Sequence, residues 1–370
     1  MKRACLLLIG LLYLMSTTTH GQSNDLYLFV GTYTTKTSEG IYVYKFNTNT
    51  GDFTPISVAT GIKNPSCLAK STYNRYLYSV AQKIGGAVSS FSFDQKSGYL
   101  TMLNTQSAGG DGPCHVAVDK TGKWVIVGNY RGGSLSILPV QVDGSLGKAT
   151  QTIQHEGSSV NKERQEKAHV HSINIAPNNE DVFVPDLGTD KIMTYQLNTQ
   201  TGQLTPGTPA FTAATPGAGP RHFTFHPNGK FAYVIQELDG TVTGFNYKKG
   251  QLAPFQTIST VPDDYKGRKW CADIHISPDG KFLYGSNRAH ESLVIYSINQ
   301  KNGQLTYVGH QDVLGKTPRN FMIDPTGKWV LVANQDTDNI VIFGRDKKTG
   351  KLTPTGKEIK VSMPVCLITL

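Results

Sequence analysis

The sequence predicts an all-β fold, a seven-bladed β-propeller with four antiparallel strands in each blade. A unit of about fifty residues recurs along the chain, most clearly from Gly112, Gly219, Cys271 and Thr317 onward. Each copy holds an apolar strand, a turn rich in Pro, Asp, Asn and Gly, and a second apolar strand after Gly-Lys. A third strand follows, and a glycine-containing turn leads to a fourth.

Three weaker copies complete the count of blades. Residues 64–104 and 168–207 carry the same pattern with altered turns. Residues 26–56 hold a second, third and fourth strand without a first, and residues 364–370 (PVCLITL) match the missing one. We therefore expect the C-terminal strand to join the N-terminal blade and close the ring, which leaves no open sheet edge. A two-sheet sandwich, the alternative, does not explain this split copy.

Residues 1–21 predict a cleaved secretory signal peptide. They have a basic start at Lys2 and Arg3, an apolar run over residues 4–15, and small residues before Gln22. The apolar run is too short to span a membrane stably, and cleavage is expected near Gly21. The remaining residues 22–370 form one predicted domain without a membrane span, located in the periplasm or outside the cell.

The net charge of the chain indicates which class of ligand it could bind. Removal of Lys2 and Arg3 would lower the formal net charge from +9 to +7. This modest excess suits an anionic small molecule, and no basic run indicates nucleic acid. Oligomeric state is not indicated.

Four cysteines, Cys67, Cys114, Cys271 and Cys366, each lie near the start of a first strand. An oxidising compartment would permit a Cys67–Cys366 disulfide between neighbouring blades. Buried, small apolar thiols are the favoured interpretation, and no CxxC spacing occurs.

Hairpin geometry gathers polar residues at one mouth of the central channel. Residues equidistant from a turn glycine should face each other across a hairpin. This places together Arg221 with Glu237, Arg319 with Gln335, Cys114 with Tyr130, His171 with Leu187, and Arg288 with Ala272. His115, His222, Asp273 and Asn320 come one position further along. Three convergent arginines favour an anionic ligand, because desolvated cations need anions. A simple ion pair that stiffens one blade is the alternative for Arg221 and Glu237.

Two polar inserts lead to the same mouth. Residues 151–167 (QTIQHEGSSVNKERQEK) show no strand pattern and precede His169 and His171. Residues 261–269 (VPDDYKGRK) precede a first strand in a later blade. Inserts of this length in a compact domain are commonly functional, so we expect them to be walls or lids of a site.

The chain resembles the seven-bladed propeller lactonases, a family that includes the bacterial propeller-type 6-phosphogluconolactonases. The fungal carboxymuconate lactonizing enzymes are more distant relatives. The resembling segments are LFVGTYT, HEGSSVNKERQEKAHVHS, GPRHFTFHPNGKFAYVIQEL, ADIHISPDGKFLYGSNRAHESLVIY and TPRNFMIDPTGKWVLVANQDTDNI. The resemblance implies lactone-ring chemistry without an obligatory metal or cofactor. It points to His171, Arg221, Glu237 and Arg288 as catalytic residues, and Arg319 matches the PRNF segment. Family members in sugar-phosphate metabolism are expected in the cytoplasm, so predicted export leaves the physiological substrate open.

Two assignments fit the opening of a δ-lactone. Glu237 is the general base in the first, and His171 in the second, which we favour because Arg221 should depress the basicity of Glu237. Arg221 and Arg288 would hold the anion and the developing oxyanion.

The residues expected to contact substrate are Arg319, His169, His222, Tyr130 and Gln335. A structural role is an alternative for His169, and its HxH motif with His171 lacks further metal ligands.

Two other function classes stay open. A non-catalytic propeller could capture an anionic sugar or a protein, and a lactonizing isomerase could hold a diacid. A carboxylate placed among arginines favours a hydrolase, since a pure anion binder gains nothing from it.

Overall fold

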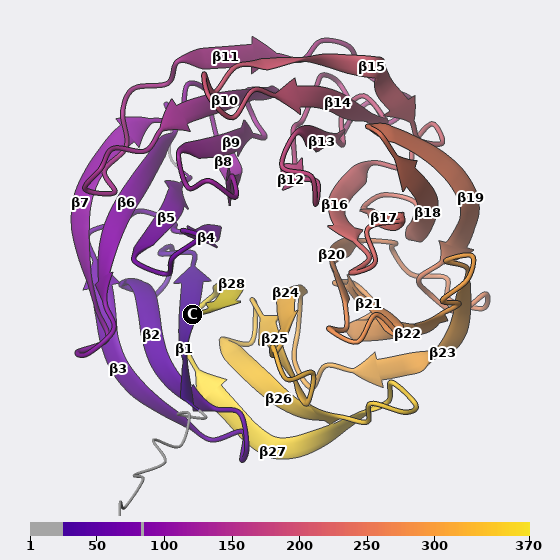
Figure 1. Cartoon of the computed structure of the whole chain (residues 1–370). Helices are drawn as coiled ribbons and strands as arrows, with labels where there is room; N and C mark the ends of the chain where they lie inside the picture. Colours follow the sequence, from indigo (N-terminus) through magenta and orange to yellow (C-terminus); the bar gives the residue numbers. More distant parts are fainter. Residues whose placement is uncertain (1–24, 83–84) are drawn as a thin grey trace, which may run out of the picture.

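The computed structural model describes residues 25–82 and 85–370, and in them the secondary structure is all strand. Seven four-stranded antiparallel sheets stand around a central channel (Figure 1). The predicted propeller, with its seven blades, is confirmed. Residues 1–24, which include the predicted signal peptide, lie outside the described residues. No helix in the described part is long and apolar enough to cross a membrane.

Four strands make up each blade, and they follow one another from the channel outward. Blades one to three consist of β28 (Pro364–Thr369), β1 (Asp25–Thr32), β2 (Gly40–Asn47) and β3 (Phe53–Thr60); β4 (Leu68–Lys70), β5 (Tyr76–Ala81), β6 (Ala87–Asp94) and β7 (Tyr99–Ser107); and β8 (Pro113–Val118), β9 (Trp124–Asn129), β10 (Ser134–Pro139) and β11 (Gln151–Gln154). Blades four and five consist of β12 (Asn174–Ile175), β13 (Asp181–Asp186), β14 (Lys191–Leu197) and β15 (Leu204–Ala213); and β16 (Pro220–Phe225), β17 (Phe231–Gln236), β18 (Thr241–Lys248) and β19 (Gln251–Ser259). Blades six and seven consist of β20 (Cys271–Ile276), β21 (Phe282–Asn287), β22 (Ser292–Ile298) and β23 (Leu305–Asp312); and β24 (Pro318–Ile323), β25 (Trp329–Asn334), β26 (Asn339–Arg345) and β27 (Leu352–Lys360).

The C-terminal strand closes the ring as predicted. β28 pairs antiparallel with β1, with Leu367 opposite Val30. Tyr27 and Leu370 then exchange two backbone hydrogen bonds, of 2.9 and 3.2 Å. The first and last strands of the chain thus lie side by side in one sheet (Figure 1). Closure satisfies the inner edge of β1, which would otherwise be open to pairing with another chain.

The hydrophobic core lies between the blades. Each apolar cluster joins two neighbouring sheets, as where Leu28 and Val30 of blade one pack on Leu331 and Ile342 of blade seven. Side chains of each strand alternate between the two faces of its sheet, so a blade offers one apolar face to each neighbour. The seven interfaces together hold the first strands in a ring and so fix the channel.

Glycines at the outer turns let aromatic rings bridge neighbouring blades. Trp124 of blade three donates from Nε1 to the carbonyl oxygen of Thr199 at 3.0 Å. Gly202 in the same turn has a φ of +71°, and a Cβ there would lie 2.3 Å from the Trp124 ring. Glycine is required at this position for both its backbone conformation and the close approach of the ring.

A β-bulge interrupts the first hairpin near the channel mouth in several blades. Pro220 pairs with Gln236 and His222 with Ile235, so Arg221 is the extra residue. Cys114 and Arg319 hold the same position in β8 and β24. The predicted face-to-face pairing is therefore wrong in its register. In the β16–β17 hairpin the pairing of His222 with Ile235 is centred half a residue before Gly229, the turn glycine. The bulge then adds one unpaired residue to β16. Bulges re-aim side chains, here toward the mouth.

The first insert is shorter than predicted. Residues 151–154 form β11, whose half-polar face made its pattern weak, so the insert begins at His155. His155 contacts Asp186 at 2.8 Å and the Tyr195 hydroxyl at 2.9 Å through its two ring nitrogens. Gln165, fully buried, donates to the carbonyl oxygen of Leu187 at 2.9 Å. Both ends of the insert are thus anchored, as a fixed wall would be.

The four cysteines of the described residues are free thiols. Cys366 Sγ accepts a hydrogen bond from the backbone N–H of Leu68 at 3.2 Å. Cys114 donates to the carbonyl oxygens of Val170 and His171 in the next blade, at 3.5 and 3.4 Å. Cys366 and Cys114 therefore bridge neighbouring first strands, and the Cys67–Cys366 disulfide is not formed. Cys271 and Cys366 are buried as expected, whereas Cys67 and Cys114 are only partly buried.

Candidate active site

A cavity of about 270 Å³ occupies the channel mouth where the first strands begin. Its walls come from several blades and from both inserts or their flanks. The lining residues are Gln82, Cys114, Tyr130, Arg131, Arg164, His171, Glu237, Trp270, Arg288 and Arg319. Four of them are arginines and one is a carboxylate, so the cavity carries an excess of positive charge suited to an anionic ligand.

Glu237 lies at the centre of the polar contacts. Its Oε2 lies 2.8 Å from Arg221 Nε and 2.9 Å from Arg288 Nη2. Its Oε1 accepts a hydrogen bond from Arg164 Nη2. The carboxylate, only 2 % exposed, thus contacts three guanidinium groups. Charge-assisted contacts of this kind hold a carboxylate in one orientation.

This surrounding charge controls the ionisation of Glu237. Burial raises the pKa of the carboxyl, but Arg288, Arg221, His171 and Arg164 together lower it well below its usual range. The group is therefore an ionised carboxylate near neutral pH and a weak base. It can orient a donor such as water without taking its proton.

His171 stands beside Glu237 with both ring nitrogens available. Its Nε2 lies 3.9 Å from Glu237 Oε2, too far for a direct hydrogen bond. Its Nδ1 is buried and has no hydrogen-bond partner among the described residues. Burial and the charges of Arg221 and the neighbouring His222 lower the pKa of His171 well below its usual value. The imidazole is neutral at neutral pH and free to accept a proton.

Arg221 and Arg288 are themselves fixed by hydrogen bonds to backbone carbonyl oxygens of β20. Arg221, 1 % exposed, donates from Nη1 to the carbonyl oxygen of Ala272. Arg288 donates from Nη2 to the carbonyl oxygen of Cys271 at 2.6 Å, and its guanidinium lies 3.9 Å from the centre of the Trp270 ring. The buried Arg288 Nε has no partner among the described residues, so one donor is available inside the site.

The sequence did not single out Arg164 or Arg131. Arg164 belongs to the first insert, and its Nη2 contacts both Glu237 and the Tyr130 hydroxyl, the latter at 3.2 Å. Its side chain is 28 % exposed, so it forms the outer wall of the cavity. The insert lies outside the repeated four-strand unit, so repeat spacing could not place its residues. The family-like segment NKERQEK was the available signal.

Of the five predicted substrate-contact residues, two line the mouth cavity and three do not. Tyr130 and Arg319 line the mouth cavity. His169 stacks on Tyr130 at 4.5 Å, and its nitrogens contact the Tyr130 carbonyl oxygen and Glu166. Gln335 donates to Asp336, and neither Gln335 nor His169 lines the cavity. His222 lies in the channel below.

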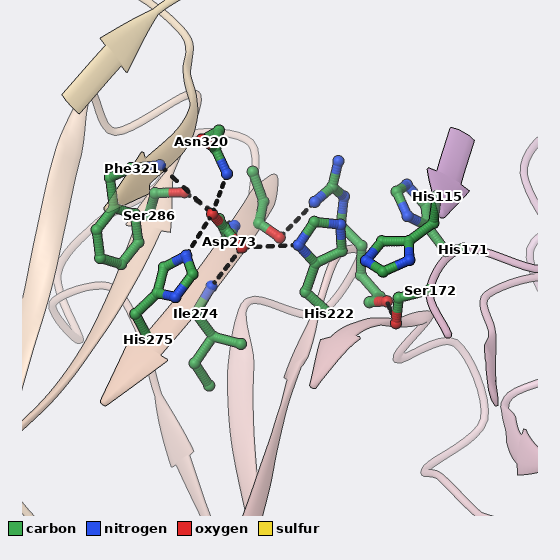
Figure 2. A network of polar contacts seen from close by, with 12 residues as sticks. His115, His171, Ser172, His222, Asp273, Ile274, His275, Ser286, Asn320 and Phe321 are labelled. Carbon is green, nitrogen blue, oxygen red and sulfur yellow. Dashed lines mark hydrogen bonds and ion pairs between the residues drawn. The ribbon is translucent and has the colours of Figure 1, made fainter. Parts of the chain in front are cut away.

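A second polar layer lies under the mouth (Figure 2). It borders a cavity of about 190 Å³ that shares Cys114, His171 and Arg319 with the first. Asp273 Oδ1 contacts His222 Nδ1 at 2.7 Å, and Asp273 Oδ2 contacts His275 Nε2 at 2.9 Å. Asn320 donates to Oδ2 as well. The four residues that the sequence places one position beyond the mouth residues do border this channel cavity. They are His115, His222, Asp273 and Asn320.

Comparison with known proteins identifies relatives over nearly the whole described chain. Residues 27–369 match the family model described as "Lactonase, 7-bladed beta-propeller". A protein named 6-phosphogluconolactonase from Formosa agariphila is 41% identical over 306 residues, which cover 80% of this chain and 86% of the relative.

Two solved structures have nearly the same fold. A putative 6-phosphogluconolactonase from Bacteroides fragilis has a TM-score of 0.89 at 42% identity and covers 94% of this chain and 98% of its own. The periplasmic gluconolactonase of Pseudomonas aeruginosa has a TM-score of 0.90 at 35% identity, with coverage of 94% and 99%.

Proposed function

The chain belongs to the family of 7-bladed β-propeller lactonases, and we propose that it hydrolyses a sugar-acid lactone in the mouth cavity. The observation that carries this proposal is the placement of an ionised carboxylate, Glu237, beside a neutral imidazole, His171, in a cavity rich in arginine. Water activation needs such a pair, and a negatively charged oxyanion needs the cations. A site built only to hold an anion would not include Glu237.

The residues take distinct roles in this proposal. Glu237 accepts a hydrogen bond from the attacking water and orients it. His171 Nε2, 3.9 Å from Glu237 Oε2, accepts a proton from the same water. Because three arginines hold Glu237 ionised and weakly basic, His171 is the stronger candidate for the base.

Arginines stabilise the charge that develops on the lactone carbonyl oxygen. Arg288 supplies the buried, unpaired Nε donor and Arg319 reaches the cavity from blade seven. Arg221 keeps Glu237 in place from below. Donors fixed before the reaction begins lower the barrier because they need no reorganisation.

We extend the proposal to location and substrate. Residues 1–21 predict export, and one structural relative is named a periplasmic gluconolactonase. Arg131 and Arg164 at the outer wall give the cavity the charge to accept a phosphate or carboxylate on the sugar. An anionic sugar-acid lactone is therefore the preferred substrate class.

A pH-stat assay on the protein from Gln22 onward tests the proposal. Gluconolactone and its 6-phosphate are compared with a buffer blank. The ratio of their two hydrolysis rates shows how much the phosphate group contributes to the rate. We expect acid release well above the blank, lost in Glu237→Gln and in His171→Ala.

Glu166→Gln is the matched control, because this half-exposed carboxylate on the first insert pairs with His169 outside the cavity. It should keep wild-type activity. No acid release from folded wild-type protein with either lactone would contradict the proposal and favour a binding propeller or a lactonizing isomerase.

A further inference from the structure

His222 and Asp273, in the layer below the mouth, form a pair that the proposed lactone chemistry has not used. Asp273 is 3 % exposed and receives side-chain hydrogen bonds on both oxygens. The backbone N–H of Ile274 adds a further bond, to Oδ1 at 3.0 Å. A buried carboxylate with this many donors is ionised and fixed in place, so the donor on each neighbour is defined.

This contact sets the tautomer of His222. A carboxylate oxygen accepts only, so the 2.7 Å contact requires the proton of His222 on Nδ1. The other nitrogen, Nε2, is then an acceptor, and no hydrogen bond to it is formed by the described residues. The imidazole borders the channel cavity of about 190 Å³. His222 is therefore prepared to receive a proton from the channel side.

The ring of His222 faces the ring of His171. The two ring centres lie 5.3 Å apart, in an edge-to-face arrangement (Figure 2). His171 Nδ1 is the buried nitrogen without a partner among the described residues. At this separation one water molecule in the shared cavity can join the two imidazoles. Such a water would complete a hydrogen-bonded path from His171 to the Asp273 carboxylate.

Charge explains why such a path is useful. A proton kept on His171 would create a cation beside Arg221 and in the field of Arg319, and the Glu237 carboxylate that offsets these charges lies 3.9 Å away, too far for a hydrogen bond. A proton moved to His222 instead gains a direct contact with the Asp273 carboxylate. Asp273 is the nearest anion to which the charge can move without approaching the substrate.

We propose that His222 takes up the proton that His171 removes from the attacking water, with Asp273 as the positioning residue that makes His222 an acceptor. This inference rests on the proposed lactone hydrolysis. One water proton passes to His171 Nε2 while the Nδ1 proton of His171 passes to His222 Nε2. The second water proton stays on the tetrahedral intermediate and moves to the ring oxygen as the carbon–oxygen bond breaks. The products are a carboxylate, a hydroxyl group and one proton, which leaves His222 for channel water, and proton exchange with water then returns the remaining proton of His171 from Nε2 to Nδ1.

The groups around His222 support this direction of transfer. Charged or titratable side chains face it from β8 (His115), from the segment before β12 (His171), from its own strand (Arg221), and from β20 (Asp273 and His275). Burial and Arg221 lower the pKa of His222 to about 4, against the effect of Asp273. The pKa of His171 is lowered well below 6.5 without such a hydrogen-bonded carboxylate. Both rings are neutral at rest, as a relay requires.

The test replaces His222 without disturbing Asp273. His222→Asn keeps a side-chain N–H near the position of Nδ1 but has no second nitrogen to accept a proton. In dilute buffer, kcat for lactone consumption, followed by NMR, should fall on the order of 100-fold, with KM unchanged. Imidazole added to the buffer should restore kcat in a saturable manner, since the channel cavity can hold it.

His115→Asn is the matched control. His115 flanks His222 with its ring centre 5.7 Å away, and its Nδ1 accepts the backbone N–H of Ile173, a bond that asparagine can replace. It makes no contact with Asp273 and should keep wild-type kcat. An equal loss in both variants, or a loss in His222→Asn that imidazole does not rescue, would overturn the relay. So would an unchanged kcat in His222→Asn.

An independent readout does not need activity. Nitrogen-15 NMR of histidine-labelled protein should show His222 as the Nδ1–H tautomer at neutral pH, and the opposite tautomer would refute the role of Asp273. Wild-type protein that opens no lactone would instead overturn the proposed function before any variants were compared. Active wild type with active His222→Asn would overturn only the relay.

Discussion

Arg221 Nε lies 2.8 Å from Glu237 Oε2, although Arg221 is the unpaired residue of a β-bulge. The bulge frees the Arg221 side chain from the alternation of its strand, so the guanidinium borders the channel cavity and reaches Glu237. Glu237 follows the last residue of β17, where the strand leaves the hairpin. The ion pair therefore joins two residues that have no partner in the β16–β17 register.

Two of the three arginines that contact Glu237, Arg221 on Oε2 and Arg164 on Oε1, should differ in their effects on stability and on activity. Arg221→Met removes a fully buried partner of Glu237 and leaves the Ala272 carbonyl oxygen without its donor, and we expect a loss of roughly 3–5 kcal/mol in the free energy of unfolding. Arg164→Met, at the exposed wall, should change it by less than about 1 kcal/mol. Arg164→Met should still reduce kcat/KM by about 10- to 100-fold, the value of a charge-assisted hydrogen bond. Urea unfolding and lactone kinetics on both variants measure this. Equal destabilisation by both would contradict the assignment of Arg164 to the wall.

Much of this site could be predicted from the repeat, and the rest could not for physical reasons. Arg221, Glu237, Arg288 and His171 do meet at one mouth, because equivalent positions of a repeat fall on equivalent positions of a ring. The bulges could not be predicted, since an added residue leaves the apolar pattern nearly unchanged. Arg164 was missed because a unique insert has no periodicity.

The pH dependence of hydrolysis should lack a limb at the usual histidine pKa. Burial and neighbouring cations lower the pKa of His171, and nearby arginines lower that of Glu237. A base works when deprotonated, so a lowered pKa extends activity to more acidic solution. We expect kcat/KM, corrected for the blank, to stay nearly constant as the pH falls through the ordinary histidine pKa of about 6.5. An acid limb with a midpoint near 6.5 would show that a histidine of ordinary pKa controls the rate.

Two glycines with the same backbone conformation should differ in their tolerance of alanine. Gly202 and Gly229 have φ values of +71° and +69°, so each Gly→Ala change costs about 1–2 kcal/mol in backbone strain. A Cβ at Gly202 would also meet the Trp124 ring, whereas nothing lies within 4 Å at Gly229. Gly202→Ala should therefore be less stable than Gly229→Ala by a further 1–3 kcal/mol or so. Chemical denaturation of the two variants measures their free energies of unfolding. Equal values would mean that the Trp124 ring moves aside at no energetic cost.

Removal of residues 364–370 should abolish the cooperative fold. Blade one would lose its innermost strand, and β1 would expose an unpaired edge together with Leu28 and Val30. We expect the shortened protein to aggregate and to lose its sharp thermal transition. A synthetic peptide of residues 361–370 should restore the transition when added in excess. A shortened protein that melts like the full chain would show that the ring does not depend on β28.

The pairing of β28 with β1 also decides which blade depends on distant sequence. Each of the other six blades takes its four strands from neighbouring sequence, whereas blade one joins strands from the two ends of the described chain. Among the described strands, blade one is therefore the blade that local sequence cannot complete. We expect the channel to be enclosed only once this long-range pairing has formed.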